Sequence, residues 1–353
     1  MSLTKIIKIN PAAPEEEYVT QAANVIIGGG LVIIPTETVY GIAANALNQK
    51  ALDRLCEIKK RSKDKPFSLI IAEKAKVEEF ARNMPVAAYK LMRKFWPGPL
   101  TLILKAISQG KVGLRMPNHP VALEIISRSK VPISCPSANL SGASAPTNFA
   151  QALIDLDGLV DLAIDAGQAN LALESTIVDL TVEPLQIVRS GAIKDADIMR
   201  VAETKTVLFI CTGNSCRSVM AEAYLKKILQ KQGRTDVQVS SAGIIRYVGL
   251  GASEETREVL KREDIDVSSH HSQGVTKELV KASDIILVME KIHEDNILRL
   301  APEVKNRLFL LKEFAKINDG NLGISDPMGR SFGAYTSTFN TIKDALERII
   351  KIL

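Results

Sequence analysis

Short apolar runs and amphipathic segments alternate along most of the chain. The clearest pair lies in the second half, where the run Val-Leu-Phe-Ile at 207–210 has the composition of a buried parallel strand. After a polar loop, apolar residues recur at helical spacing from Ser218 to Leu229. In the first half, residues 15–27 show the same helical spacing and are followed by an apolar strand pattern at 31–35. Strands that alternate with helices predict an α/β protein.

Three glycines at 28–30 separate the predicted helix from the predicted strand in the first half. A glycine cluster suggests a nucleotide-binding loop, but such a loop follows a strand and opens onto a helix. Here the order is reversed. We therefore interpret these glycines as a helix stop, because glycine readily adopts the left-handed conformation that ends helices.

The polar loop of the second half has the sequence Cys-Thr-Gly-Asn-Ser-Cys-Arg-Ser. Cys211 and Arg217 are separated by five residues at a helix N-terminus, where backbone N–H groups and the helix dipole favour an anion. Arg217 can bind two phosphate oxygens at once. The same positive field should hold Cys211 as a thiolate, which is the nucleophilic form of cysteine. The loop therefore predicts a nucleophile and an oxyanion clamp for a phosphate dianion.

Two plainer interpretations exist for the cysteines of this loop. Cys211 and Cys216 could be buried structural thiols, since free cysteine is usually buried, or they could form half of a metal site. No Cys-x-x-Cys pair or histidine cluster stands beside them in the sequence to complete a metal shell. The strand, the Gly-Asn turn and the Arg-Ser pair all favour the anion site. A Cys211–Cys216 disulfide that protects the nucleophile from irreversible oxidation remains an open hypothesis.

The segment VLFICTGNSCRSVMAEA resembles the signature of the low-molecular-weight protein tyrosine phosphatase family. By this resemblance Cys211 attacks phosphorus, Arg217 binds the phosphoryl oxygens and Asp326 is the general acid-base. Ser218 would hydrogen-bond the thiolate, and Asn214 would hold the loop in shape. The resemblance implies a flavodoxin-like parallel-sheet phosphatase domain that acts on phosphoprotein. It extends to the end of the chain, through the motifs at 240–243, 268–272, 282–289 and 326–329.

Two positions in this half bear on the substrate. Ser215 stands where tyrosine-specific members carry an aliphatic residue and where the related protein arginine phosphatases carry threonine. Asp326 is followed by Pro-Met-Gly, and not by Pro and paired tyrosines that would stack on a phosphotyrosine ring. Both differences favour phosphoarginine, but serine is not threonine, so phosphotyrosine remains the alternative. Arsenate reductases share the fold but use further cysteines, and none follows Cys216.

Polar motifs follow apolar strand patterns throughout the first half. Open α/β sheets bind ligands beyond their strand ends, so such positions are candidates for a site. Taken singly, each motif is typical of an ordinary turn, a solvated face or a rigid corner. Their joint order favours a binding site. The motifs are PTETVYGIAANA (35–46), EIKKRSKDKPFSL (57–69), FWPGPLTLIL (95–104), VGLRMPNHP (112–120), CPSANLSG (135–142), ESTIVD (174–179) and IVRSG (187–191).

Together these motifs resemble the YrdC-like family, which includes the threonylcarbamoyl-AMP synthases, over about residues 5–195. The Lys-x-Arg and Ser-x-Asn pairs characteristic of that family are both intact, as Lys59/Arg61 and Ser137/Asn139. The resemblance implies an N-terminal open twisted α/β sheet domain. It would convert L-threonine, bicarbonate and ATP into threonylcarbamoyl-AMP and pyrophosphate, the first step in making the threonylcarbamoyladenosine of tRNA. The tRNA threonylcarbamoyl transferase machinery would then be a partner.

An ATP site of this kind needs several cations, with Mg²⁺ around the triphosphate. The threonine site is expected to pair Arg115 with the carboxylate of the amino acid, and no metal site is expected in the protein itself. The threonine-binding candidates are Thr36, Thr38, Arg115 and Ser175. The ATP-binding candidates are Lys59, Arg61, Lys65, Ser137, Asn139 and Arg189.

One departure from the longer synthases concerns closure of this site. In those proteins a linker and a further domain follow the YrdC-like domain, whereas here the phosphatase signature begins about a dozen residues after Arg189.

A different hypothesis makes the first domain a non-catalytic RNA-binding module. The basic residues lack the interleaved aromatic side chains that single-strand binders use as stacking platforms, which disfavours it.

Composition agrees with a soluble globular protein, with 46% hydrophobic and 24% charged residues, and 353 residues suffice for two domains. The net charge of +5 divides into +2 for residues 1–203 (23 Lys and Arg, 21 Asp and Glu) and +3 for the rest. Neither half is basic enough to predict nucleic-acid binding from charge alone. Four cysteines, with no signal peptide or membrane-length apolar run, predict a reducing cytoplasm. We expect domains at 1–200 and 201–353, with residues 192–205 as a connector without strong pattern.

Overall fold

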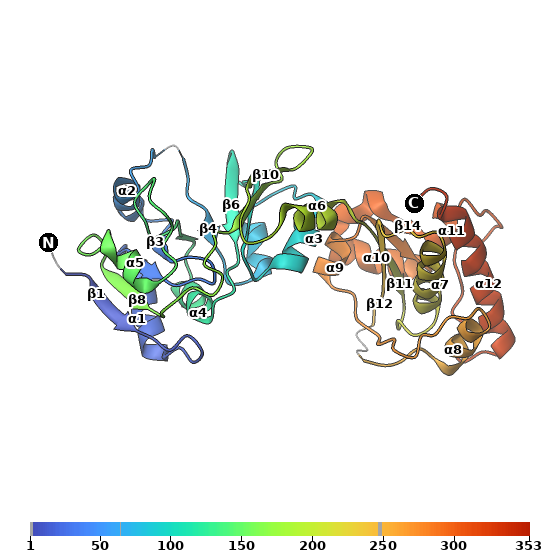
Figure 1. Ribbon diagram of the computed structural model, residues 1–353. Helices are drawn as coiled ribbons and strands as arrows, with labels where there is room; N and C mark the ends of the chain where they lie inside the picture. The colour runs from blue at the N-terminus through green and yellow to red at the C-terminus, as the bar shows by residue number, and fades with distance from the viewer. Residues whose placement is uncertain (1–2, 64, 246–248) are drawn as a thin grey trace. The chain divides into compact units, whose positions relative to one another are not determined.

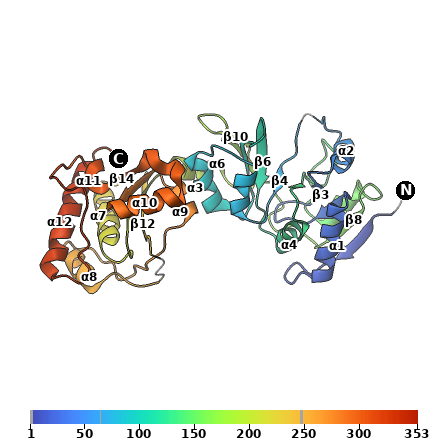
Figure 2. The ribbon, with the colours of Figure 1, turned by 180° about the vertical axis from the view of Figure 1, so that it is seen from behind.

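The computed structural model describes residues 3–63, 65–245 and 249–353 (Figures 1 and 2). The chain divides into two compact units, residues 1–201 and 202–353. Each unit has a β-sheet of its own, with helices packed against it.

A ten-stranded mixed sheet forms the first unit, in the order β1-β8-β2-β3-β7-β4-β6-β5-β9-β10. Parallel pairs such as β1 with β8 and β5 with β9 alternate with antiparallel pairs such as β2 with β3 and β5 with β6. The strands are β1 (Lys5–Lys8), β2 (Val32–Ile34), β3 (Gly41–Asn45), β4 (Leu69–Ile70), β5 (Leu100–Lys105), β6 (Lys111–Arg115), β7 (Ile133–Ser134), β8 (Leu162–Asp165), β9 (Thr176–Asp179) and β10 (Gln186–Arg189).

Helices cover both faces of this sheet. Along β2, Val32 and Ile34 pack into one hydrophobic cluster while Ile33 packs into another, as the two-residue period of a strand requires. Helices α1 and α4 lie side by side over the first of these faces (Figures 1 and 2). The helices are α1 (Glu16–Ile27), α2 (Gln49–Ile58), α3 (Val86–Phe95), α4 (Pro120–Ser129), α5 (Phe149–Ile154), α6 (Asp195–Glu203) and the 3₁₀ helix η1 (Lys74–Glu79).

A four-stranded, fully parallel sheet forms the second unit, in the order β12-β11-β13-β14. The first strand in sequence lies second in the sheet, which is the flavodoxin-like arrangement. The strands are β11 (Lys205–Cys211), β12 (Val237–Gly243), β13 (Ile285–Val288) and β14 (Leu308–Leu310). The helices are α7 (Arg217–Lys231), α8 (Glu254–Lys261), α9 (Lys277–Lys281), α10 (Lys291–Leu300), α11 (Leu311–Phe314), α12 (Phe332–Ile349) and the 3₁₀ helix η2 (Pro302–Arg307).

Strand β11 is buried on both faces, which explains its continuous apolar run. Val207 and Phe209 face the cluster that contains α7 and α12, whereas Leu208 and Ile210 face the cluster that contains α9 and α10. Each of these four side chains is at most 1% exposed, and burial of such a side chain contributes about 1.5–3 kcal/mol. The strand thereby fixes where the loop after Cys211 begins.

The predicted α/β fold class is confirmed for both halves, as are the helix near residues 15–27 and the strand near 31–35, within one residue at most of the ends. Gly28 caps α1, and Gly29 has the positive φ of 86° that a helix stop favours. The boundary between the two units lies within residues 192–205, the segment predicted as a connector. This segment includes helix α6, whose Ile198 and Val201 pack into a cluster of the first unit.

Candidate functional sites

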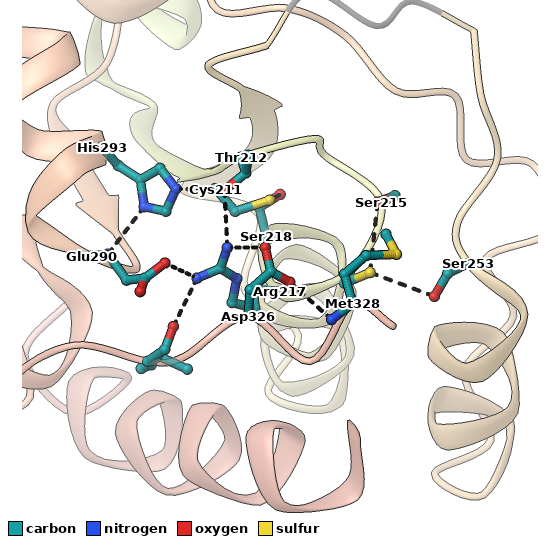
Figure 3. Close-up of polar contacts among 12 residues, drawn as sticks. Cys211, Thr212, Ser215, Arg217, Ser218, Ser253, Glu290, His293, Asp326 and Met328 are labelled. Atoms are coloured by element: carbon teal, nitrogen blue, oxygen red, sulfur yellow. Dashed lines mark hydrogen bonds and ion pairs between the residues drawn. The ribbon is translucent and has the colours of Figure 1, made fainter. Parts of the chain in front are cut away.

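The phosphate-binding candidate begins where β11 ends and α7 starts. Cys211 is the last residue of the strand, and Arg217 is the first residue of the helix. The Cys211 Sγ atom lies 2.9 Å from the Ser218 hydroxyl oxygen, so the serine can stabilise a thiolate (Figure 3). The seven-residue step from strand to helix brings thiol, helix N-terminus and guanidinium together, as the sequence predicted.

Asn214 holds the loop in its shape. Its φ is +53°, a left-handed conformation that asparagine tolerates better than most residues. Its side-chain amide donates to the hydroxyls of Ser218 at 3.0 Å and Ser241 at 2.7 Å. The backbone carbonyl of Asn214 accepts a hydrogen bond of 2.8 Å from His270 Nε2. A Cβ atom at Gly243 would lie 2.9 Å from the Asn214 nitrogen, so only glycine lets β12 approach this loop.

Arg217 is fully buried, and carboxylates surround its guanidinium (Figure 3). Nη1 pairs with the Glu290 carboxylate, and it also donates to the Ile324 carbonyl at 2.8 Å. Nη2 pairs with the Asp326 carboxylate. Within the described ranges, Nε of Arg217 has no hydrogen-bond acceptor. A buried donor without a partner costs about 1–3 kcal/mol, so an anionic ligand that accepts from Nε would bind favourably.

Glu290 and His293 were not predicted from the sequence. The backbone N–H of Glu290 donates to His293 Nδ1 at 3.0 Å, and His293 Nε2 lies 3.0 Å from the Thr212 hydroxyl. Burial and the nearby Arg217 guanidinium lower the pKa of His293 to about 4, so the imidazole is neutral near pH 7. The signal that could have found these residues is their position directly after the apolar strand Ile285–Val288, at the ligand-binding edge of a parallel sheet.

Sulfur and hydroxyl groups gather around Cys216, in the same loop as Cys211. The Cys216 Sγ atom lies 3.6 Å from the Ser215 hydroxyl, 3.5 Å from that of Ser253 and 3.8 Å from that of Tyr335. Met328 also contacts Tyr335, with its Sδ 3.8 Å from the phenol oxygen (Figure 3 labels Ser215, Ser253 and Met328). All four cysteines of the chain are free thiols. Ser215 and Met328 therefore belong to one group of contacts around Cys216 and Tyr335.

In the first unit, polar residues from distant segments line one cavity. Among the predicted residues, the ends of strands and the loops after them contribute Thr36, Lys59, Arg61, Arg115, Ser137, Asn139, Ser175 and Arg189. Thr38 joins them through its hydroxyl, which accepts a hydrogen bond of 2.8 Å from Arg115 Nη2. Glu174, which was not predicted, lines the same cavity.

Lys65 is the predicted ATP-binding residue that lies apart from this cavity. It lines a different pocket, with Asp53, Cys56 and Lys63. The chain folds back after Arg61, whose Nε donates to the Lys65 carbonyl at 3.0 Å. That turn explains why four residues of separation do not bring the two cationic side chains to one place.

Lys59 clamps the Ser-x-Asn loop. Its ammonium donates to the carbonyls of Ser137 at 2.8 Å and Asn139 at 2.6 Å, and to the Asn139 side-chain oxygen at 3.0 Å. These bonds use all three protons of an ammonium group. Burial, together with the nearby Arg61, lowers the pKa of Lys59 to about 8. Lys59 and Asn139, predicted separately as ATP contacts, are therefore parts of one hydrogen-bonded unit.

Two arginines of the cavity are paired with carboxylates. Arg189 pairs with Glu174 and also donates to the Ser175 hydroxyl at 3.0 Å. Arg115 lies 2.8 Å from a carboxylate oxygen of the buried Glu37. Substrate anions would have to share these guanidinium groups with the carboxylates. The thiol of Cys135 also lines the cavity, but burial raises its pKa to about 12, so it stays protonated.

Across the part of the chain that the structure describes, no group of three or more His, Cys, Asp or Glu side chains is placed to hold a metal ion. Among the described helices, none combines the length and the apolar composition that crossing a membrane requires.

Family models match the two units separately. A model of Sua5, YciO and YrdC proteins, described as telomere recombination, matches residues 24–191. A model of low molecular weight phosphotyrosine protein phosphatases matches residues 206–353.

Curated relatives give the same division. Threonylcarbamoyl-AMP synthases from Pyrococcus abyssi and Bacillus subtilis are 40% and 38% identical to 53% of this chain, which covers 58% and 57% of their lengths. A Methanocaldococcus jannaschii protein, also named for threonylcarbamoyl-AMP synthesis, is 35% identical, with 54% of this chain and 94% of that protein aligned. A protein-arginine-phosphatase from Geobacillus stearothermophilus is 34% identical over 42% of this chain and 95% of its own length. The chain thus spans little more than half of the first two relatives.

Solved structures support the fold. A double variant of P. abyssi Sua5 is similar with a TM-score of 0.52 and 26% identity, over 86% of this chain and 98% of that one. P. abyssi Sua5 in complex with L-threonine gives a TM-score of 0.54 at 23% identity, over 97% and 98% of the two chains, which is a likeness of fold.

Fold and family models together define a chain of two α/β enzyme domains, the second of which carries Cys211 and Arg217 at the two ends of a strand-to-helix loop. The chain belongs to the YrdC-like family in its first part and to the low-molecular-weight protein tyrosine phosphatase family in its second.

Proposed function

We propose that the chain is a bifunctional enzyme. Residues 1–200 form threonylcarbamoyl-AMP and pyrophosphate from L-threonine, bicarbonate and ATP, and so supply the tRNA threonylcarbamoyl transferase machinery. Residues 201–353 dephosphorylate phosphoprotein through a phosphocysteine intermediate, with phosphoarginine as the favoured substrate. The four free thiols support a reducing, cytoplasmic location.

The observation that carries the synthase proposal is the convergence of Lys59, Arg61, Arg115 and Arg189 on one cavity. In the proposed reaction the threonine nitrogen forms a bond to the bicarbonate carbon and water leaves. An oxygen of the resulting carbamate then attacks the α-phosphorus of ATP, and pyrophosphate departs. Both steps develop negative charge on oxygen, which fixed cations stabilise.

We assign the residues of the cavity to the two substrates. Arg189, with Lys59 and Arg61, suits the triphosphate, and the clamped Ser137–Asn139 loop supplies neutral hydrogen bonds. Arg115, together with Thr36, Thr38 and Ser175, suits threonine, whose carboxylate would take the place of Glu37 on Arg115. Mg²⁺ usually binds through triphosphate oxygens and waters with one or two carboxylates, and Glu174 is the carboxylate that lines this cavity.

Isotope labelling tests the synthase proposal. With ATP, L-threonine and ¹³C-bicarbonate, mass spectrometry should detect threonylcarbamoyl-AMP one mass unit heavier than the product from unlabelled bicarbonate. RNA binding without this product would instead support a first domain that only binds RNA or nucleotide.

The observation that carries the phosphatase proposal is the buried Arg217, whose Nε donor has no acceptor among the described residues. Arg217 begins α7, directly after the loop that starts at Cys211. The Cys211 thiolate attacks phosphorus, and the bond from phosphorus to the substrate nitrogen or oxygen breaks. Asp326 gives its proton to the leaving group. Water then attacks the phosphocysteine, returns a proton to Asp326 and releases phosphate, which regenerates the thiolate.

Two observations favour phosphoarginine over phosphotyrosine. Ser215 puts a small hydroxyl in the loop, and the relative from G. stearothermophilus is named as a protein-arginine-phosphatase. A comparison of kcat/KM on phosphoarginine and phosphotyrosine peptides of equal sequence tests the preference. A higher value on phosphotyrosine would reverse the assignment and leave the cysteine mechanism intact.

A further inference from the structure

A second hydroxyl, that of Thr212, lies in the phosphate loop directly after the nucleophile. It receives two hydrogen-bond donors. Arg217 Nη2 donates to its Oγ1 at 3.0 Å, and His293 Nε2 lies 3.0 Å from the same oxygen (Figure 3).

The proton positions on His293 follow from its other contact. Nδ1 accepts the backbone N–H of Glu290 at 3.0 Å, so Nδ1 carries no proton. The imidazole is buried beside the Arg217 guanidinium, which disfavours a second positive charge. The single proton of the neutral ring is therefore on Nε2, and His293 is a donor to Thr212.

A hydroxyl has two acceptor lone pairs and one proton. Arg217 and His293 fill both lone pairs of Thr212, so its proton must point elsewhere. In the portion of the chain that the structure describes, that proton has no acceptor. Thr212 directly follows Cys211, so a phosphoryl group bound in this loop would supply the missing acceptor.

We propose that the Thr212 hydroxyl donates a hydrogen bond to the transferred phosphoryl group and that His293 is the positioning residue that fixes its direction. The inference rests on the phosphatase function proposed for the second unit and names a binding residue of that site. Thr212 adds a neutral donor to the backbone N–H groups and to Arg217. His293 would act through Thr212, because its imidazole contacts that hydroxyl.

The test measures anion binding separately from turnover. The inhibition constant for orthovanadate is determined during hydrolysis of an activated aryl phosphate, and binding of inorganic phosphate is measured by calorimetry in the Cys211→Ser background. Thr212→Val keeps the shape and removes the hydroxyl, whereas Thr212→Ser keeps the hydroxyl. His293→Leu removes the imidazole donor, and His293→Gln replaces it with an amide N–H. His271→Gln, at an exposed neighbouring histidine, is the matched control.

Thr212→Val should weaken both anions by about 10- to 100-fold, the usual effect of losing one hydrogen bond to a charged group. Thr212→Ser and His271→Gln should stay within about threefold of the wild type. His293→Leu should weaken vanadate like Thr212→Val, and His293→Gln should restore most of the loss. In the Thr212→Val background, His293→Leu should have no further effect, because its effect passes through the hydroxyl.

Unchanged vanadate inhibition in Thr212→Val would overturn the proposal. A loss from His293→Leu that persists in the Thr212→Val background would show that the histidine is merely structural. If His293→Leu fails to fold, as judged by thermal melting, the proposal can still be tested with three other variants. These are Thr212→Val, Thr212→Ser and His293→Gln. Failure of the phosphatase function itself is distinct, because then the wild type would not hydrolyse the aryl phosphate at all.

Discussion

The two candidate sites differ in how the chain builds them. In the second unit the proposed nucleophile Cys211 and the proposed phosphate-binding Arg217 lie within eight consecutive residues, Cys211–Ser218, together with Asn214 and Ser218. In the first unit the cavity takes residues from Thr36 to Arg189, contributed by several strand ends and loops. A site formed by one stretch of sequence can be predicted from that stretch alone. A site formed by many segments can be predicted only when several weak motifs are considered together.

In both sites, carboxylates already pair with the arginines that substrate anions would bind. Arg217 pairs with Asp326 and Glu290. Arg189 pairs with Glu174, and Arg115 pairs with Glu37. Arg217 alone of the three has an unpaired buried nitrogen, Nε, among the residues described. We therefore expect the second unit to bind an inorganic anion by itself, while the first unit needs its complete substrates to displace the carboxylates.

The largest effect on activity is expected from replacement of Cys211. Replacement by serine should reduce phosphatase turnover by at least about 10⁴-fold, because the nucleophile is lost. Phosphate binding should remain largely intact, since the backbone and Arg217 form the anion site. Turnover and calorimetric phosphate binding on the same preparation check this, with Cys56→Ser in the first unit as the control. Loss of binding together with turnover would count against the assignment of roles within the loop.

The next largest effect is expected from replacement of Asp326, the proposed proton donor to the leaving group. Asp326→Asn should slow hydrolysis of a phosphoester with a poor leaving group by about 10²–10⁴-fold, because no acid protonates the departing oxygen. An activated aryl phosphate, whose leaving group needs little protonation, should be affected much less. The surface variant Asp344→Asn is the control. Equal slowing of both substrates would remove Asp326 from the general-acid role.

Replacement of Ser215 is expected to have a smaller effect, on substrate preference. Ser215→Ile should lower kcat/KM for a phosphoarginine peptide by about tenfold relative to a phosphotyrosine peptide, about the discrimination expected from one contact. Ser215→Thr should keep or raise the preference for phosphoarginine. Peptides that differ only in the phosphorylated residue provide the measurement, and a ratio that both variants leave unchanged would exclude Ser215 as a specificity residue.

The smallest expected effect is a pH dependence of synthase activity, which depends on Lys59 in the cavity of the first unit. The pKa of Lys59 is about 8, lowered from 10.5, so its ammonium is present below pH 8 and is lost as the pH rises through that value. A neutral amine has two protons for three acceptors, and the Ser137–Asn139 loop should loosen. Synthase activity should therefore fall severalfold between about pH 7.5 and 9. Lys59→Arg, which keeps its charge, should lack this step; a step of equal size at equal pH in that variant would assign it to another group.

Much of the phosphate loop could be predicted from the sequence because contacts and sequence neighbours coincide there. Glu290, His293 and Glu174 were not predicted, because each reaches its partner through tertiary packing and no sequence spacing links it to that partner. Lys65 was chosen as an ATP contact for its positive charge, and that role stays a prediction. Charge alone does not say which pocket a residue lines, and Lys65 lines a different pocket from Arg61. Helix α6 was missed because its apolar face is only a few residues wide.

The measurement that tests the bifunctional proposal most directly is pyrophosphate release from ATP by the intact purified chain, with L-threonine and bicarbonate each present or omitted. The phosphatase unit rests on a compact motif, so this assay examines the more distributed site. We predict release that requires both co-substrates and that persists in the Cys211→Ser variant. No release in the presence of Mg²⁺, from protein that still hydrolyses an aryl phosphate, would contradict the synthase function while leaving the phosphatase in place.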